Sequence, residues 1–142
     1  MLTSIKLRIH GDLLDPEEIT AILKISPHIF RRKGDVRVCA SQKEVASKLG
    51  IWVWQSNDPS ETFTINDHIS RLRATFAPVY SLLPNLPNTD YAWVDVYIAV
   101  GENDGSTSSV WFDMNVESIS TLREIGLPVE FTVDTVSSPE QA

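Results

Sequence analysis

The sequence has little cysteine, few glycines and no long hydrophobic run. Cys39 is the only cysteine in 142 residues, which excludes an internal disulfide and the zinc sites built on paired cysteines. The six glycines are scattered, so neither a Walker nor a Rossmann phosphate-binding loop is present. The most apolar stretch, residues 91–100, is too short to span a bilayer and contains Asp95. We therefore expect a cytoplasmic domain with no membrane segment.

Basic residues are scarce in the second half of the chain. Residues 1–73 contain eleven basic and nine acidic residues, whereas residues 74–142 contain only Arg123 against ten acidic residues. The net charge of −7 repels phosphate backbones, which makes nucleic acid an unlikely partner. The densest basic run is Arg31, Arg32 and Lys33. It fits either a solvated loop or an anion-binding site.

Length and patterning indicate a single domain over residues 1–136 and a flexible tail over residues 137–142. Alternation of apolar and polar residues predicts strands near residues 5–10, 91–100 and 129–133. Shorter strands are expected at 36–38 and 51–54. We interpret residues 101–105 as a hairpin loop and residues 110–114 as its returning antiparallel strand. Residues 42–49 are expected to be a helical turn or a loop.

Capping residues mark three helices between these strands. Asp15 followed by Pro16 favours a helix start, and this role also explains the local acidic residues better than a metal or acid–base site does. Thr64 and Asp67 resemble a capping box before a long apolar stripe over 65–83, in which Pro78 predicts a kink or early stop. Asn115 is expected to cap the third helix.

The order of these elements predicts an α+β fold. Helices of this kind need an apolar sheet face to cover, and the alternating strands supply one. We therefore expect a mainly antiparallel sheet with the helices packed on one face, of ferredoxin-like type.

Residues 11–27, GDLLDPEEITAILKISP, followed by Arg32-Lys33-Gly34, resemble the opening of a bacterial family known as domain of unknown function 4279. The later tryptophan strand at Trp52 and Trp54, the long helix and the hairpin are similar to that family as well. The resemblance covers nearly the whole chain and implies a compact bacterial α/β domain. It transfers no activity, cofactor or catalytic residue.

No residue pattern indicates a catalytic centre. The three histidines, His10, His28 and His68, lie in separate elements and lack the spacing of a zinc site. We interpret His68 as a surface or boundary residue and Cys39 as a packing residue. No nucleophile-elbow motif surrounds a serine or cysteine. The sequence therefore favours a protein that is not an enzyme and has no metal or cofactor.

The most informative pattern is an aromatic face of the predicted sheet. If Ile5, Val53 and Val94 face the helices, a period of two places a set of large aromatic and charged side chains on the opposite face. That set is Lys6, Arg8, Trp52, Trp54, Tyr91, Trp93, Asp95 and Tyr97. Three alternatives follow from this pattern. The segment 26–49 covers these aromatic residues, or they form a homodimer or partner interface, or they line a ligand groove. Asp95 is either a functional carboxylate or the ion-pair partner of Lys6 or Arg8.

These features suggest a non-catalytic protein-interaction module, for example an immunity-type protein that neutralises a toxic partner. The alternative is a small-molecule or anion-binding domain that uses Arg31, Arg32 and Lys33 with Asp95. A structural domain within an oligomer is the third hypothesis.

Overall fold

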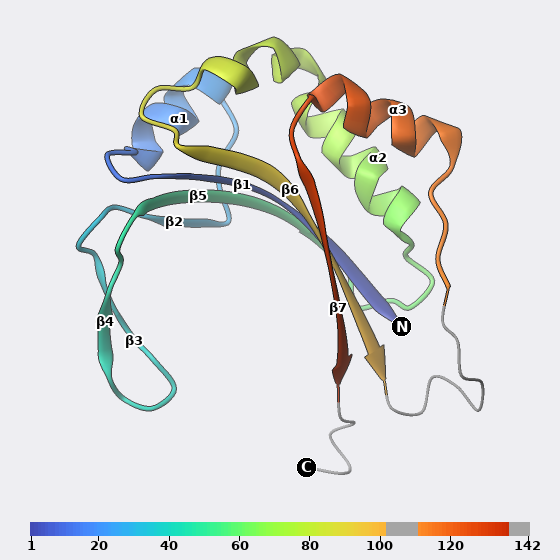
Figure 1. Cartoon of the computed structure of the whole chain (residues 1–142), viewed down its shortest axis with the longest axis horizontal. Helices are drawn as coiled ribbons and strands as arrows, with labels where there is room; N and C mark the ends of the chain where they lie inside the picture. Colours follow the sequence, from blue (N-terminus) through green and yellow to red (C-terminus); the bar gives the residue numbers. More distant parts are fainter. Residues whose placement is uncertain (102–110, 137–142) are drawn as a thin grey trace.

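The computed structural model describes residues 1–101 and 111–136, which form a five-stranded sheet, a separate two-stranded hairpin and several helices (Figure 1). In chain order the elements are β1 (Leu2–Gly11), α1 (Pro16–Leu23), β2 (Ile29–Arg31), β3 (Val36–Val38), β4 (Glu44–Ala46), β5 (Gly50–Asn57), α2 (Ile65–Phe76), the 3-10 helix η1 (Ala77–Asn85), β6 (Tyr91–Gly101), α3 (Val116–Ile125) and β7 (Val129–Val136). The expected flexible tail, residues 137–142, lies outside the described residues.

The five-stranded sheet has the order β2-β5-β1-β6-β7, with β1 at its centre. β1 pairs antiparallel with both β5 and β6, and β2 pairs antiparallel with β5. β7 lies parallel to β6, so the chain crosses over between them through α3. The sheet is therefore mixed but mostly antiparallel, which confirms the predicted α+β class.

All the helices lie on one side of the curved sheet, as predicted (Figure 1). β1 alternates strictly, so that Ile5, Leu7 and Ile9 are fully buried beneath the helices. α2 packs its buried residues, among them Leu72 and Phe76, into the same core. Each such side chain contributes roughly 1.5–3 kcal/mol when it leaves water, so this layer supplies much of the folding free energy.

The predicted caps form as the sequence indicates. The Asp15 side chain accepts a hydrogen bond from the Glu17 backbone N–H, and Thr64 and Asp67 complete a capping box at the start of α2. Asn115 caps α3 by accepting from the backbone N–H of Ser118. α2 ends at Phe76 and continues as η1, which confirms the predicted early stop before Pro78.

Two glycines allow the chain to pass closely where β1 meets β5. Gly11 and Gly50 are paired in the antiparallel ladder and are both buried. A Cβ atom on Gly11 would overlap the carbonyl oxygen of Asn88, and one on Gly50 would overlap that of Leu14. Both overlaps involve backbone atoms, so any side chain at these positions would force the strands and loops apart.

Two predicted elements differ from the structure. Residues 111–114 form no strand, so the expected antiparallel return after β6 is wrong for this part of the chain, and the strand beside β6 is the parallel β7. Residues 102–105 of the expected hairpin loop lie outside the described residues. Residues 44–46 are a strand, β4, rather than a helical turn or loop, because they pair with the predicted strand β3.

The ferredoxin-like subtype is not confirmed. A ferredoxin-like unit has the order β-α-β-β-α-β, in which two strands follow one another directly. Among the described long strands, a helix lies between β1 and β5, between β5 and β6, and between β6 and β7.

Candidate functional site

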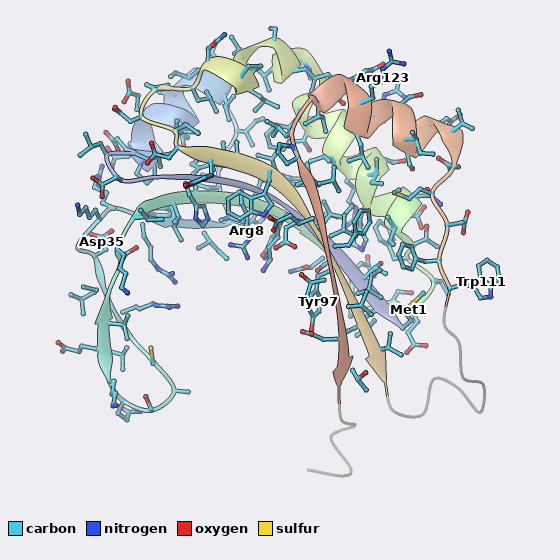
Figure 2. All side chains as sticks on the ribbon, in the orientation of Figure 1. Met1, Arg8, Asp35, Tyr97, Trp111 and Arg123 are labelled. Atoms are coloured by element: carbon cyan, nitrogen blue, oxygen red, sulfur yellow. The ribbon has the colours of Figure 1, made fainter. Side chains whose placement is uncertain are left out.

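The sheet face opposite the helices, here called the open face, bears the polar and aromatic side chains that the period of two predicts. The strand registers place Arg8 beside Trp93 and Val53, Lys6 beside Asp95, and Ser4 beside Tyr97. Arg8 and Tyr97 are seen on the side of the sheet away from the helices in Figure 2. The open face comprises Ser4, Lys6, Arg8, His10, Ile29, Arg31, Ile51, Val53, Gln55, Tyr91, Trp93, Asp95, Tyr97, Glu130, Thr132 and Asp134.

Trp52 and Trp54 do not belong to this face, and their predicted placement is wrong. Trp52 pairs with Ile9 and Trp54 with Leu7, so both rings point into the helix-covered core. Their rings make edge contacts with Phe76 of α2. Val53 correspondingly faces the open side and not the helices as expected. The error arose because residues 51–54 are all apolar, so the alternation has no visible phase in this strand.

An ion pair lies at the centre of the open face. Arg8 Nε donates to Asp95 Oδ2 at 3.0 Å, and both side chains are partly buried. This contact agrees with the interpretation of Asp95 as the ion-pair partner of a basic residue on the neighbouring strand. The Asp95 carboxylate, which the anion-binding hypothesis assigned to a ligand site, is thus already paired with Arg8.

Next to this pair, two rings leave hydrogen-bonding atoms unused. The His10 and Trp93 rings lie 4.7 Å apart between centroids. His10 Nε2 and Trp93 Nε1 are buried and have no hydrogen-bond partner in the described part of the chain. Burial, and then the charge of Arg8, lowers the pKa of His10, so its ring is neutral at pH 7. Native structures rarely leave such atoms unpaired, so this corner of the face contains two polar atoms that the described residues leave unsatisfied.

The β6–β7 side of the open face combines aromatic and acidic groups. Tyr91 is 67% exposed, and a hollow of about 380 Å³ at the start of β6 has Tyr91, Trp93 and Glu130 among its lining residues. Farther along, the Tyr97 hydroxyl hydrogen bonds to Asp134, and the pKa of Tyr97 is raised by desolvation and by this carboxylate. These side chains offer both rings and negative charge to a neighbouring molecule.

The predicted basic run is divided among different roles. Arg31 lies on the open face in β2, beside Ile51. Arg32 forms ion pairs with Asp15 and Glu17. Lys33 forms an ion pair with Asp12 at 2.8 Å. Acidic residues in the turn after β1 and at the start of α1 thus pair with two of the three basic residues, which leaves little positive charge there for an anion.

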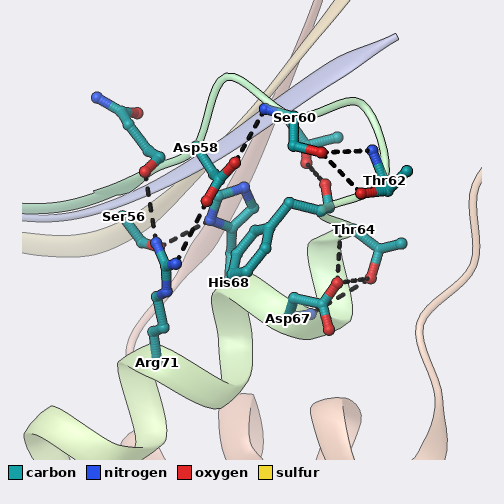
Figure 3. Close-up of polar contacts among 11 residues, drawn as sticks. Ser56, Asp58, Ser60, Thr62, Thr64, Asp67, His68 and Arg71 are labelled. Carbon is teal, nitrogen blue, oxygen red and sulfur yellow. Dashed lines mark hydrogen bonds and ion pairs between the residues drawn. The ribbon is translucent and has the colours of Figure 1, made fainter.

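One polar cluster, at the end of β5, is missing from the sequence interpretation (Figure 3). His68 is fully buried and not a surface residue as expected, and its Nδ1 lies 2.8 Å from Ser56 Oγ. Arg71 Nη1 donates to Ser56 Oγ, and Arg71 also pairs with Asp58. Arginine only donates, so Ser56 Oγ accepts from Arg71 and also hydrogen bonds to His68 Nδ1. Sequence periodicity signals the burial of His68, because His68 precedes Ile69 and lies one turn before Leu72 on the buried stripe of α2, but it does not identify Ser56 as the partner.

This cluster joins β5 to α2 and does not resemble an accessible catalytic pair. Ser56 is 3% exposed, so its hydroxyl has little access to a substrate. Burial lowers the pKa of His68, and the Thr3 backbone partly opposes this shift. The buried ring is therefore a hydrogen-bonding group that joins β5 to α2 within the fold.

Searches for metal and membrane sites in residues 1–101 and 111–136 were negative. No three His, Cys, Asp or Glu residues in these ranges are grouped as metal ligands would be. Within the same ranges, no helix combines the length and the apolar character needed to cross a bilayer.

Comparisons with known proteins give the family. No curated protein and no solved structure shows a significant match to this chain. A family model described as Domain of unknown function (DUF4279) matches residues 1–136, which confirms the resemblance found in the sequence. The match extends over all the strands and helices described above, from β1 to β7. The chain therefore belongs to the DUF4279 family.

Proposed function

We propose that this domain is a non-catalytic protein-interaction module that binds a protein partner through its open face. The observation that carries the proposal is the composition of that face, where Tyr91, Trp93 and Tyr97 surround the Arg8–Asp95 ion pair. Tyrosine, tryptophan and arginine are the residues that most often anchor protein–protein interfaces. A solvated antiparallel face would ordinarily be polar, and three large rings there favour a partner.

The same geometry favours a protein over an anionic ligand. The basic run that an anion would need is paired internally through Arg32 and Lys33. Glu130 and Asp134 add negative charge beside the aromatic rings, which disfavours phosphate groups. A protein surface with apolar and basic groups complements both features.

The narrower, immunity-type form of this proposal makes the partner a toxic enzyme that the domain neutralises. It predicts that the isolated partner is active and that stoichiometric addition of the domain inhibits it. Residues on the open face, rather than residues around Ser56 and His68, then determine the inhibition.

The proposal is tested by recovering the partner from the native cells with a tagged domain. We expect a protein in near-stoichiometric amount with the unchanged chain. A double variant, Trp93→Ala with Tyr97→Ala, should lose that protein. Val116→Ala is the matched control, because Val116 is 78% exposed on α3, on the helix side of the sheet.

The two variants separate the possible outcomes. Thermal unfolding of each variant shows that loss of the partner does not reflect loss of the fold. Equal recovery with the wild type and the Trp93/Tyr97 variant would refute the proposed surface. Loss with Val116→Ala alone would assign recognition to the helix side instead.

A further inference from the structure

The β3–β4 hairpin, here called the arm (residues 36–46), projects from the sheet on the side away from the helices (Figure 1). Its two strands form a separate sheet and pair only with each other. Val36 and Val38 are 61% and 63% exposed. These two valines share one surface of the arm with Glu44 and Ala46, and Arg37 and Val45 share the other. Two-stranded hairpins without a packed face are marginally stable in water, so the arm gains stability when either surface packs against another molecule.

The arm is nevertheless ordered from base to tip. At its base, Gly34 N–H donates to Ser47 O and Ser47 N–H donates to Asp35 O. At its tip, Cys39 N–H donates to Lys43 O and Gln42 N–H donates to Cys39 O. A continuous ladder of this kind holds side chains at fixed spacings and suits the arm for docking.

The arm and the β6–β7 side of the open face carry opposite charges. Alternation places Arg37 and Lys43 on one surface of the arm, with Val45 between them. Neither basic side chain forms an ion pair within residues 1–101 and 111–136. On the other side, β7 presents Glu130 and Asp134 to the open face and has no basic residue.

We propose that two copies of this chain form a symmetric dimer in which the arm of each copy lies on the β6–β7 side of the other's open face. Arg37 and Lys43 of one copy then face Glu130 and Asp134 of the other, and Val45 lies among the exposed aromatic rings. This inference rests on the proposed function and names its partner as a second copy. A two-fold axis repeats the same arm-to-face contact twice, so the assembly closes as a dimer.

A symmetric pairing of the β7 edges centred on Thr132 is unfavourable. β7 is an edge strand, and edge strands can join across a two-fold axis into a continuous sheet. An antiparallel β7–β7 pair centred on Thr132 would place Glu130 directly opposite Asp134 of the second copy. Like charges in that position are destabilising, so the charge pattern disfavours this edge contact.

The test is a charge swap read out by sedimentation velocity and light scattering. Arg37→Glu with Lys43→Glu makes the arm acidic, and Glu130→Lys with Asp134→Lys makes the β7 side basic. We expect each variant alone to dimerise at least about tenfold more weakly than wild type, because each contact now joins like charges. In an equimolar mixture both contacts join opposite charges again, so a one-to-one heterodimer should form.

The controls separate this dimer from general charge effects. Arg73→Glu with Arg123→Glu reverses two charges on α2 and α3, on the helix side, and should leave the dimer unchanged. Wild-type dimerisation should weaken as salt is added, because the paired groups are exposed. All variants alter exposed residues and should keep the wild-type circular dichroism spectrum.

Two results would overturn the inference: a wild-type chain that stays monomeric at all concentrations, or a dimer that neither reversed variant weakens. A monomeric chain that still recovers another protein through Trp93 and Tyr97 would refute the dimer and leave the proposed function standing. A charge-dependent dimer together with equal recovery of another protein by the wild type and the Trp93/Tyr97 variant would support the dimer and refute the open face as the binding surface for that protein.

Discussion

Replacing Trp52 by alanine tests the assignment of the two β5 tryptophans to the core. The Trp52 side chain is fully buried, its ring contacts Phe76 edge-on, and its Nε1 donates to Thr20 Oγ1 at 3.1 Å. Truncation removes these contacts and leaves a cavity between β5 and the helices. Tryptophan-to-alanine changes in cores cost about 3–5 kcal/mol, and the lost hydrogen bond places this change toward the upper end.

The expected loss is a large part of the total stability of a domain this size, which is roughly 5–15 kcal/mol. It should lower the melting temperature by on the order of 10 °C. Urea unfolding followed by far-ultraviolet circular dichroism measures the change without relying on tryptophan fluorescence. Trp93→Ala is the matched control, since Trp93 is only partly buried on the open face.

Comparing the stability losses of Trp52→Ala and Trp93→Ala tests whether Trp52 lies in the core. Trp93→Ala should cost less, about 1–2 kcal/mol, because its ring is only partly buried and no helix covers it. If Trp52→Ala costs no more than Trp93→Ala, Trp52 does not lie in the core and the register of β5 against β1 is wrong.

Three further predictions concern stability. A double-mutant cycle with Arg8→Met and Asp95→Asn should give a coupling of about 1 kcal/mol, because both side chains are partly exposed; a coupling indistinguishable from zero would argue against the ion pair. Burial lowers the pKa of His10 and His68 in the folded state, so the unfolded state binds more protons as the pH falls below about 6.5. The free energy of unfolding should therefore decrease below that pH and stay level above it. In urea titrations at several pH values, His68→Gln should flatten the decrease. Gly50→Ala should destabilise the fold by roughly 1–3 kcal/mol in the same assay, since its Cβ would meet the Leu14 carbonyl, and an unchanged stability would refute that close approach.

Local patterns predicted much of the fold because their physical causes are local. The caps at Asp15, Thr64 and Asn115 require only a side-chain acceptor and a free backbone N–H within three residues. The faces of β1 and β6 followed from clean alternation, which places Arg8 and Trp93 together on the open face. These predictions needed no information about distant parts of the chain.

The remaining features depend on contacts between distant segments. The apolar run 51–54 fits either phase, and only the pairing of Trp52 with Ile9 decides which side chains enter the core. His68 hydrogen bonds to Ser56 because β5 and α2 meet in space, and periodicity along α2 indicates only that His68 is buried. β7 lies parallel to β6 because α3 carries the chain back to the end of the sheet at which β6 begins.

The sequence by itself thus determined the helices, the alternating strands and the presence of an aromatic, charged sheet face, since each arises from interactions over a few residues. Only the tertiary structure decided which tryptophans occupy that face and which basic residues are already neutralised. It also placed the arm at one edge of the open face and the acidic β6–β7 side at the other. These outcomes depend on strand register and on the meeting of distant charges, and neither has a signature in local periodicity.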